Sequence, residues 1–155
     1  MISGNFPANG AQCGAYLVWK LAQESGGGSV AGNIVLLRKA PGVTADTLRC
    51  GYFLKVISYF PDIHILESYY DNDDTEQSLI NAQNALQLFD DIDAFFCEGL
   101  TQTPVAIEAV NSAGRWESRE DGKKIIMLTI DDTKESFNFL DQGIVEVNCP
   151  YTPLI

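Results

Sequence analysis

Five short apolar runs alternate with helix-like segments along this chain, and that alternation limits the folds open to it. The runs are Ile34–Leu37, Ile63–Leu66, Ala94–Cys97, Ile125–Ile130 and Ile144–Val147. Continuous apolar runs of this length are typical of parallel strands that are buried on both faces. Strands that alternate with helices predict a sheet covered by helices on both sides. We therefore expect an α/β fold, a three-layer α/β/α sandwich around a five-stranded, mainly parallel sheet.

The segments between the apolar runs carry helix signals. We expect helices over Ala11–Glu24, after a Thr44 N-cap, over Thr75–Phe89, from near Pro104, and over Glu135–Leu140. The second of these carries Leu48, Tyr52, Val56 and Tyr59 at helical spacing, widened by Phe53, Ile57 and Phe60, which predicts a core-facing stripe. The glycine-rich stretch Ser25–Ser29 precedes a strand and is interpreted as a turn, since a phosphate loop would follow one.

Polar side chains gather just after the predicted strands. In chain order they are Arg38, Lys39 and Arg49; Asp71, Asp73 and Asp74; Glu98; Asp131 and Asp132; and Asn148. In an open parallel sheet the carboxyl ends of the strands form one edge, and ligands bind in the crevice outside it. The pattern therefore predicts a binding site at that edge. Asp90, Asp91 and Asp93 instead precede a strand, so we expect them to be solvated.

Length and charge restrict the possible partners. The chain has 155 residues, which suits one domain, and 46% of them are hydrophobic. Its formal net charge of -11 disfavours nucleic acid and anionic membranes as partners, because like charges repel. No apolar run is long enough to cross a membrane, and the first residues show no signal-peptide pattern. We expect residues 1–155 to be a single lobe taken from a longer protein.

The four cysteines, Cys13, Cys50, Cys97 and Cys149, match no zinc-binding spacing. Each lies beside apolar residues, so we expect buried, reduced thiols, with disulfides or ligation as the alternatives. We expect no metal and no cofactor.

The residues that most enzymes need are missing from the expected places. No G-x-S-x-G or Walker loop occurs, and the single histidine, His64, lies inside a strand. Asp71–Thr75 resembles the start of a calcium loop, but Glu76 replaces the glycine that such a loop needs. A two-carboxylate glycosidase stays open, because carboxylate separation needs coordinates. We expect the chain not to be an enzyme.

A phosphoacceptor receiver domain has the same count of strands and helices. That family needs an acidic pair after its first strand and a lysine after its fifth. Here the first strand leads into Arg38 and Lys39, and the fifth into Asn148. The receiver interpretation is therefore disfavoured.

Four stretches together resemble a known family: Ala40–Phe53, Asp91–Cys97, Thr129–Thr133 and Asn148–Tyr151. They are similar to the carboxy-terminal lobe of type I periplasmic sugar-binding proteins, the ribose-binding and related solute receptors of ABC transporters. The same lobe occurs in the effector domain of lactose-repressor-type regulators. The resemblance covers nearly the whole chain.

The resemblance implies roles for particular residues. Arg49 would bond sugar hydroxyls through its planar fork, and Asp131 would accept hydrogen bonds from two adjacent hydroxyls. Asn148 stands where the family often has glutamine, while Gly99 and Leu100 occupy the positions of the family's asparagine–aspartate pair, with Glu98 nearby. That last departure points to a sugar other than ribose, a polyol or another small polar ligand. The alternatives are a helix N-cap for Asp131 and a surface salt bridge for Arg49.

The family also implies a function and partners. The chain would be the non-enzymatic, cofactor-free lobe of a carbohydrate receptor, which holds a sugar or polyol by hydrogen bonds in an interlobe cleft. Its partners would be the missing amino-terminal lobe and, through the parent protein, a membrane permease, with no nucleic acid bound by this lobe. The parent would be periplasmic, or extracellular and membrane-anchored. The alternative is the effector-sensing domain of a transcriptional regulator, which would be cytoplasmic, or of a sensor kinase. Half a cleft predicts weak or no ligand binding by the chain alone.

Overall fold

Five parallel strands form the centre of the fold, in the order β2-β1-β3-β4-β5. The computed structural model describes residues 5–117, 119 and 122–150. The strands are β1 (Gly32–Arg38), β2 (Ile63–Tyr70), β3 (Ala94–Cys97), β4 (Ile126–Thr129) and β5 (Val147–Asn148). All four neighbouring pairs run parallel. The expected α/β sandwich around a five-stranded parallel sheet is confirmed.

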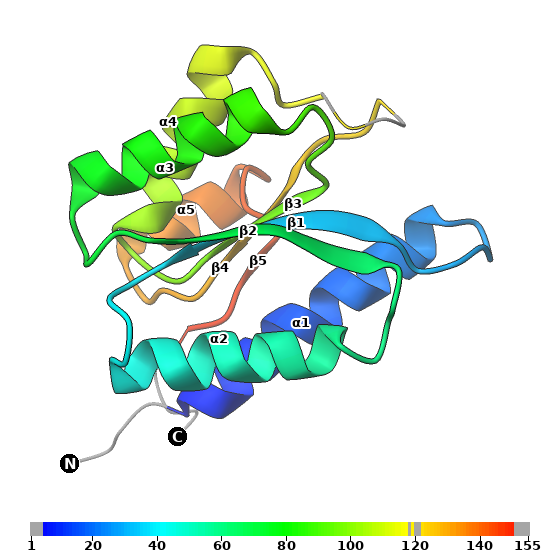
Figure 1. The fold of residues 1–155 in the computed structure, drawn as a ribbon, viewed down its shortest axis with the longest axis horizontal. Helices are drawn as coiled ribbons and strands as arrows, with labels where there is room; N and C mark the ends of the chain where they lie inside the picture. The colour runs from blue at the N-terminus through cyan, green and yellow to red at the C-terminus, as the bar shows by residue number, and fades with distance from the viewer. Residues whose placement is uncertain (1–4, 118, 120–121, 151–155) are drawn as a thin grey trace.

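Helices cover both faces of this sheet (Figure 1). One layer contains α1 (Phe6–Glu24) and α2 (Thr44–Ile57), and the other contains α3 (Thr75–Leu88), α4 (Gln102–Ala113) and α5 (Lys134–Asp141). Successive side chains of β1 alternate between the layers, because strand side chains point to opposite faces. Ile34 and Leu36 join the core under α1 and α2, whereas Val35 and Leu37 join the core under α3 and α4.

The apolar stripe of α2 is rotated from the predicted one. Tyr52 and Tyr59 are 40% and 73% exposed, whereas Phe53 is fully buried. Phe53 stacks on Phe96 of β3, with ring centroids 4.2 Å apart and planes 21° apart. Stacking of this kind stabilises the pair beyond the burial of their area. Thr44 is the first helical residue, so the predicted Thr44 N-cap is also wrong: the N-cap is Val43, which makes no side-chain cap bond.

The first helix begins earlier than its sequence predicts, at Phe6 rather than Ala11. Asn5 caps it, since its Oδ1 accepts a hydrogen bond from Ala8 N at 3.2 Å. Pro7 fits the first turn, where its missing N–H is not needed. Gly10 lies inside α1 against α2: a Cβ there would come within 1.9 Å of the Arg49 carbonyl oxygen. The glycine is needed for that close approach.

The last strand lies later than predicted. Of the run Ile144–Val147, only Val147 belongs to β5. The backbone amides of Ile144 and Val145 both donate to the Phe139 carbonyl, at 2.9 and 3.2 Å, so these residues close the end of α5. Val145 is nevertheless 1% exposed. The apolar run indicates burial correctly, but a turn provides that burial in place of a strand.

Replacement of Gly10 by alanine tests the crossing of α1 and α2. We expect Gly10→Ala to lower the free energy of unfolding by about 1 to 3 kcal/mol, because the new methyl group forces the helices apart. Gly51→Ala is the matched control, since a Cβ on Gly51 of α2 meets no atom within 4 Å. Alanine there raises helix propensity by up to about 1 kcal/mol. Urea unfolding measures both, and equal stability of the two variants would contradict the close crossing.

Candidate functional site

Four of the five predicted site residues form two hydrogen-bonded pairs at the carboxyl edge of the sheet. Arg49, on α2, donates from Nη1 to the backbone oxygen of Glu98 at 3.0 Å, directly after β3. Asn148 Oδ1, at the end of β5, accepts from the backbone N–H of Asp131 at 3.1 Å. Gly99 lies between the pairs: a Cβ on it would be 3.6 Å from the Ile130 carbonyl oxygen. The sequence placed all five at this edge, and the contacts connect them as neighbours.

Arg49 is part of the interior of the lobe. It is 4% exposed, so a surface salt bridge, the alternative role considered for it, is wrong. Its guanidinium carbon lies 4.8 Å from the centroid of the Phe6 ring. A cation over an aromatic face is stabilised by the ring quadrupole. α1, α2 and the loop after β3 therefore position this side chain together.

A buried ion pair that the sequence did not reveal supports the same corner of the sheet. Arg38, the last residue of β1, donates from Nε and Nη2 to the two carboxylate oxygens of Asp46 on α2, both at 2.8 Å. Asp46 is 2% exposed. A bidentate pair of this kind fixes geometry as well as charge. The Arg38 guanidinium also lies over the Tyr70 ring, 4.5 Å from its centroid, which connects the end of β2 to the cluster.

Glu98 is a fully buried acid directly after β3. The residue is 0% exposed, and its Oε2 accepts the backbone N–H of Lys39 at 3.0 Å. Burial, together with a hydrogen bond to the Asp46 carboxyl group, raises the pKa of Glu98 to about 8, against the opposing effects of the Lys39 N–H and Arg49. At neutral pH the carboxyl group is therefore mostly protonated. Its position makes Glu98 a support for the loop after β3 rather than a surface group.

Asp131 orders the loop that follows β4. Its Oδ1 accepts the backbone N–H groups of Asp132 and Thr133, at 2.7 and 3.3 Å, and its Oδ2 accepts the Thr133 hydroxyl at 2.9 Å. The N-cap of α5 is Thr133, whose Oγ1 accepts Ser136 N at 3.2 Å, so the N-cap role considered for Asp131 is wrong. A carboxylate has about four lone-pair positions, so Asp131 keeps capacity for another donor.

Asn148 links the loop to the sheet and remains partly exposed. Its Nδ2 donates to the Ser136 hydroxyl at 3.1 Å, while its Oδ1 holds the Asp131 amide. These bonds fix which way the amide group points. The side chains at this edge are therefore held in place by the protein before any ligand arrives.

Asp71, predicted at the same edge, follows β2 and is 1% exposed. Its two carboxylate oxygens, Oδ1 and Oδ2, accept hydrogen bonds from Gln102 Nε2 at 3.0 and 2.8 Å. Asn72 and Asp73 follow with positive φ angles of 56° and 61°. Lys39 pairs with Asp73 across this turn. A hollow of about 590 Å³ next to the turn is lined by Asp71, Asn72, Asp74, Glu76, Gln77 and Ile80. None of the five predicted site residues lines it.

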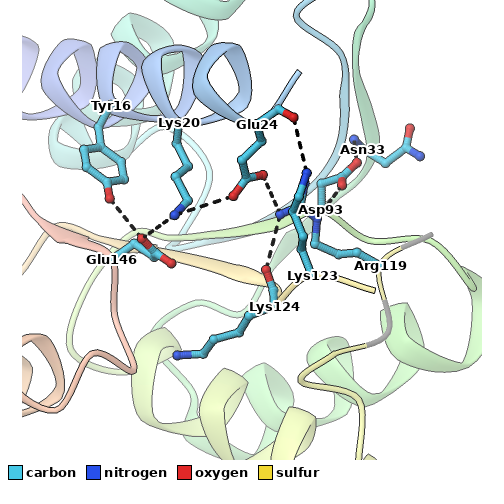
Figure 2. A network of polar contacts seen from close by, with 9 residues as sticks. All are labelled: Tyr16, Lys20, Glu24, Asn33, Asp93, Arg119, Lys123, Lys124 and Glu146. Carbon is cyan, nitrogen blue, oxygen red and sulfur yellow. Dashed lines mark hydrogen bonds and ion pairs between the residues drawn. The ribbon is translucent and has the colours of Figure 1, made fainter. Parts of the chain in front are cut away.

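A second hollow, of about 620 Å³, lies at the opposite, amino edge of the sheet. Arg119 borders it and is bonded to two acids: Nη1 lies 2.8 Å from Glu24 Oε2, and Nε lies 2.7 Å from Asp93 Oδ1 (Figure 2). Asp93 Oδ2 also accepts Asn33 N at 2.7 Å. The expectation that Asp93 is only solvated is therefore wrong. This network joins the end of α1, the start of β1 and the long connection before β4.

The same network continues along α1 (Figure 2). Lys20 Nζ lies 3.5 Å from Glu24 and 3.4 Å from Glu146, and the Tyr16 hydroxyl donates to Glu146 at 3.0 Å. Desolvation by burial, together with the bond to Glu146, raises the pKa of Tyr16 to about 12. The positive charge of Lys20 is balanced by Glu24 and Glu146, which indicates that this network joins α1 to the segment before β5.

The described part of the chain offers no group of three or more His, Cys, Asp or Glu side chains placed to hold a metal ion. All four cysteines are buried as free thiols. None of the helices described here combines the length and apolarity that a membrane crossing requires.

Comparison with known proteins assigns the chain to a class, the periplasmic binding proteins. The sequence model of the periplasmic binding protein domain matches residues 1–149, and the chain belongs to this family. This is a family of binding proteins, in agreement with the expected non-enzymatic role. No curated protein matches the sequence.

Solved structures show the same fold. An ABC transporter periplasmic solute-binding protein from Actinobacillus succinogenes 130z with bound D-allose matches with a TM-score of 0.78 and 24% identity, over 93% of this chain and 46% of that one. The periplasmic component of an ABC-type sugar transport system from Hahella chejuensis matches with a TM-score of 0.78 and 21% identity, over 94% and 49%. A protein from Mycobacterium smegmatis gives 0.78 and 23%, over 93% and 46%. The chain thus spans about half the length of these structures, which is one lobe.

The buried carboxyl group of Glu98 predicts a pH dependence of stability. Its pKa is about 8 in the folded chain against an ordinary value of 4.5, so between these values the folded state keeps a proton that the unfolded state releases. The free energy of unfolding should therefore fall as pH rises through this window, by at most about 1.4 kcal/mol per pH unit.

Glu98→Gln removes this titration and keeps the shape of the side chain. We expect a flatter dependence of stability on pH for the variant, measured by urea unfolding from about pH 5 to about pH 8. Glu108→Gln, at an exposed position of α4, is the matched control and should leave the slope unchanged. Parallel curves for Glu98→Gln and the wild type would contradict the buried, protonated carboxyl group.

Proposed function

We propose that this chain is the ligand-binding lobe of a carbohydrate receptor of an ABC transporter. It binds a sugar, a polyol or a similar hydroxyl-rich molecule at the carboxyl edge of its sheet. The observation that carries the proposal is the junction of Arg49–Glu98 and Asp131–Asn148 around Gly99, in a chain of the periplasmic binding protein family. Relatives of the same fold are described with bound D-allose, D-arabinose and D-fucose.

The chemistry of the edge suits hydroxyl groups, which both donate and accept. Asp131 accepts, Arg49 donates, and the Asn148 amide offers both atom types. Hydrogen bonds to charged groups are stronger than neutral ones, which gives specificity for a polar, uncharged ligand. Glu98 and Gly99 support the site: the first positions the loop, and the second leaves space beside the Ile130 carbonyl group.

The lobe supplies half of such a site. Arg49 and Asp131 are each 4% exposed, and neither of the two hollows is lined by any of the five residues. A pocket normally buries most of its ligand, so the second lobe of the parent protein would have to close over this edge. The parent would then lie outside the cytoplasmic membrane and deliver its ligand to a permease.

A sensory role is the second candidate. One structure of similar fold, with a TM-score of 0.75 and 17% identity, is described as a complex of XylFII with LytSN. A lobe of this shape therefore takes part in protein complexes in a relative. If this chain acts in the same way, ligand binding at the carboxyl edge would be read by a protein partner, as in a regulator or a sensor kinase, rather than by a permease.

Ligand binding by the two-lobed parent tests the proposal. We expect a monosaccharide or polyol to raise its melting temperature. Asp131→Ala should weaken binding about ten- to hundredfold, because it removes a charge-assisted hydrogen bond worth about 1.5 to 3 kcal/mol, and Asn148→Ala about two- to tenfold, because its neutral amide forms a bond worth about 0.5 to 1.5 kcal/mol. Isothermal titration calorimetry measures the loss.

Glu108→Ala, on the exposed side of α4, is the matched control and should bind as the wild type does. Residues 1–155 alone should show no binding at millimolar sugar. Unchanged affinity in both site variants would refute the site. Millimolar or tighter binding by the isolated chain would refute its description as half a cleft.

A further inference from the structure

Two of the four buried thiols lie directly against each other. Cys13 Sγ, on α1, is 3.1 Å from Cys149 Sγ, the residue that follows β5. The two cysteines are 136 positions apart in sequence. A disulfide bond is about 2.05 Å long, so the sulfur atoms need to approach by only about 1 Å to bond.

Hydrogen bonds hold both residues in this position. The Cys13 thiol donates to the Thr129 carbonyl oxygen at 3.5 Å, and the backbone N–H of Cys149 donates to the same oxygen at 2.9 Å. Asn9, one turn before Cys13 on α1, donates from Nδ2 to the Cys149 and Pro150 carbonyl oxygens at 3.3 and 2.7 Å. The end of β4 and the first turns of α1 therefore keep the two sulfur atoms in contact.

The two thiols differ in reactivity. The hydrogen bond from Cys13 lowers the pKa of Cys149, although burial opposes this. Burial raises the pKa of Cys13, and the neighbouring Cys149 raises it further while Arg49 opposes the rise. The thiolate is the nucleophile, and Cys149, 3% exposed against 0% for Cys13, is also the more accessible of the two, so Cys149 takes the first step and Cys13 resolves the product. Cys97 packs on the opposite face of the sheet, under α3 and α4.

We propose that Cys13 and Cys149 are a redox modification site, at which a small peroxide forms a reversible disulfide that ties α1 to the segment after β5. The Cys149 thiolate attacks one oxygen of hydrogen peroxide, the O–O bond breaks, and a sulfenic acid and hydroxide form. The Cys13 thiol then attacks that sulfur, the S–O bond breaks, and water leaves. Two thiols are oxidised, and one peroxide is reduced to two waters, with the two thiol protons included.

The bond would act on a sensitive part of the fold. β5 has two residues, and the chain leaves the sheet at Cys149 and Pro150. A disulfide to α1 would fix the direction in which the chain leaves this lobe, and would restrict the unfolded chain through a loop of well over 100 residues. The inference depends on neither the identity nor the existence of a ligand.

Peroxide treatment of residues 1–155, followed by alkylation in denaturant and mass spectrometry, tests the proposal. We expect a mass loss of about 2 Da, two alkylated cysteines instead of four, and a linked peptide pair that contains Cys13 and Cys149. Dithiothreitol should reverse the change. The oxidised chain should melt at a higher temperature than the reduced chain.

Cys149→Ala should remove the mass loss, whereas Cys97→Ala, the matched control, should retain it. Since either substitution changes a buried position, the linked peptide in the wild-type chain is the decisive result. Four alkylated cysteines after peroxide treatment would overturn the proposal. A bridge that includes Cys50 or Cys97, or one between two chains, would overturn it as well.

Discussion

Burial of the sheet on both faces is the constraint on which the rest of the structure depends. Every residue of β3 and β4 is buried, with helices above and below. No charged side chain can remain in such strands without a partner, so polar groups concentrate where strands begin and end. The amino and carboxyl edges of the sheet differ in the residues that their connecting segments carry. The amino edge carries the Arg119 network beside a hollow of about 620 Å³, and the carboxyl edge carries the loops that hold Glu98 and Asp131.

The charges at the carboxyl edge are arranged before any ligand binds. Asp46 is neutralised by Arg38, Arg49 bonds a backbone oxygen, and Glu98 keeps a proton because burial disfavours its charged form. Asp131 and Asn148 hold each other through one amide group. Groups that are held in their binding orientation lose little conformational entropy when a ligand arrives, which favours affinity. These bonds hold the side chains in one arrangement, although neither of the two described hollows is lined by Arg49, Asp131 or Asn148.

The sequence predicted the alternation of strands and helices along the chain and the parallel sheet, and the candidate site residues lie at the carboxyl edge where it expected them. The prediction succeeded because a parallel strand buried on both faces is a continuous apolar run. The bounds of β3, Ala94–Cys97, are the same as those of the predicted run. It misplaced β5, because burial by a turn and burial by a strand select the same apolar residues. It also missed the start of α1, where the packing of Gly10 against α2 overrides the low helix propensity of glycine.

Two charged contacts lay beyond the reach of sequence patterns. Asp46 pairs with Arg38 across a strand, a turn and a helix start, and Asp93 pairs with Arg119 across a helix and a long connection. No periodic rule connects residues in this way, because the pairs depend on how elements meet in space. Asp131 showed the opposite error: its place before a helix suggested an N-cap, and Thr133 two residues later takes that role.

Amide chemical-shift mapping of the two-lobed parent, titrated with the monosaccharide that stabilises it most, tests the location of the site most directly. Binding at the carboxyl edge predicts shifts concentrated at Lys39, Gly99, Asp131 and Asn148, in the loops that follow β1, β3 and β4 and in β5 itself. Shifts concentrated instead around Asn33, Asp93 and Arg119 would place the ligand at the amino edge and contradict a binding cleft formed by the carboxyl ends of the strands.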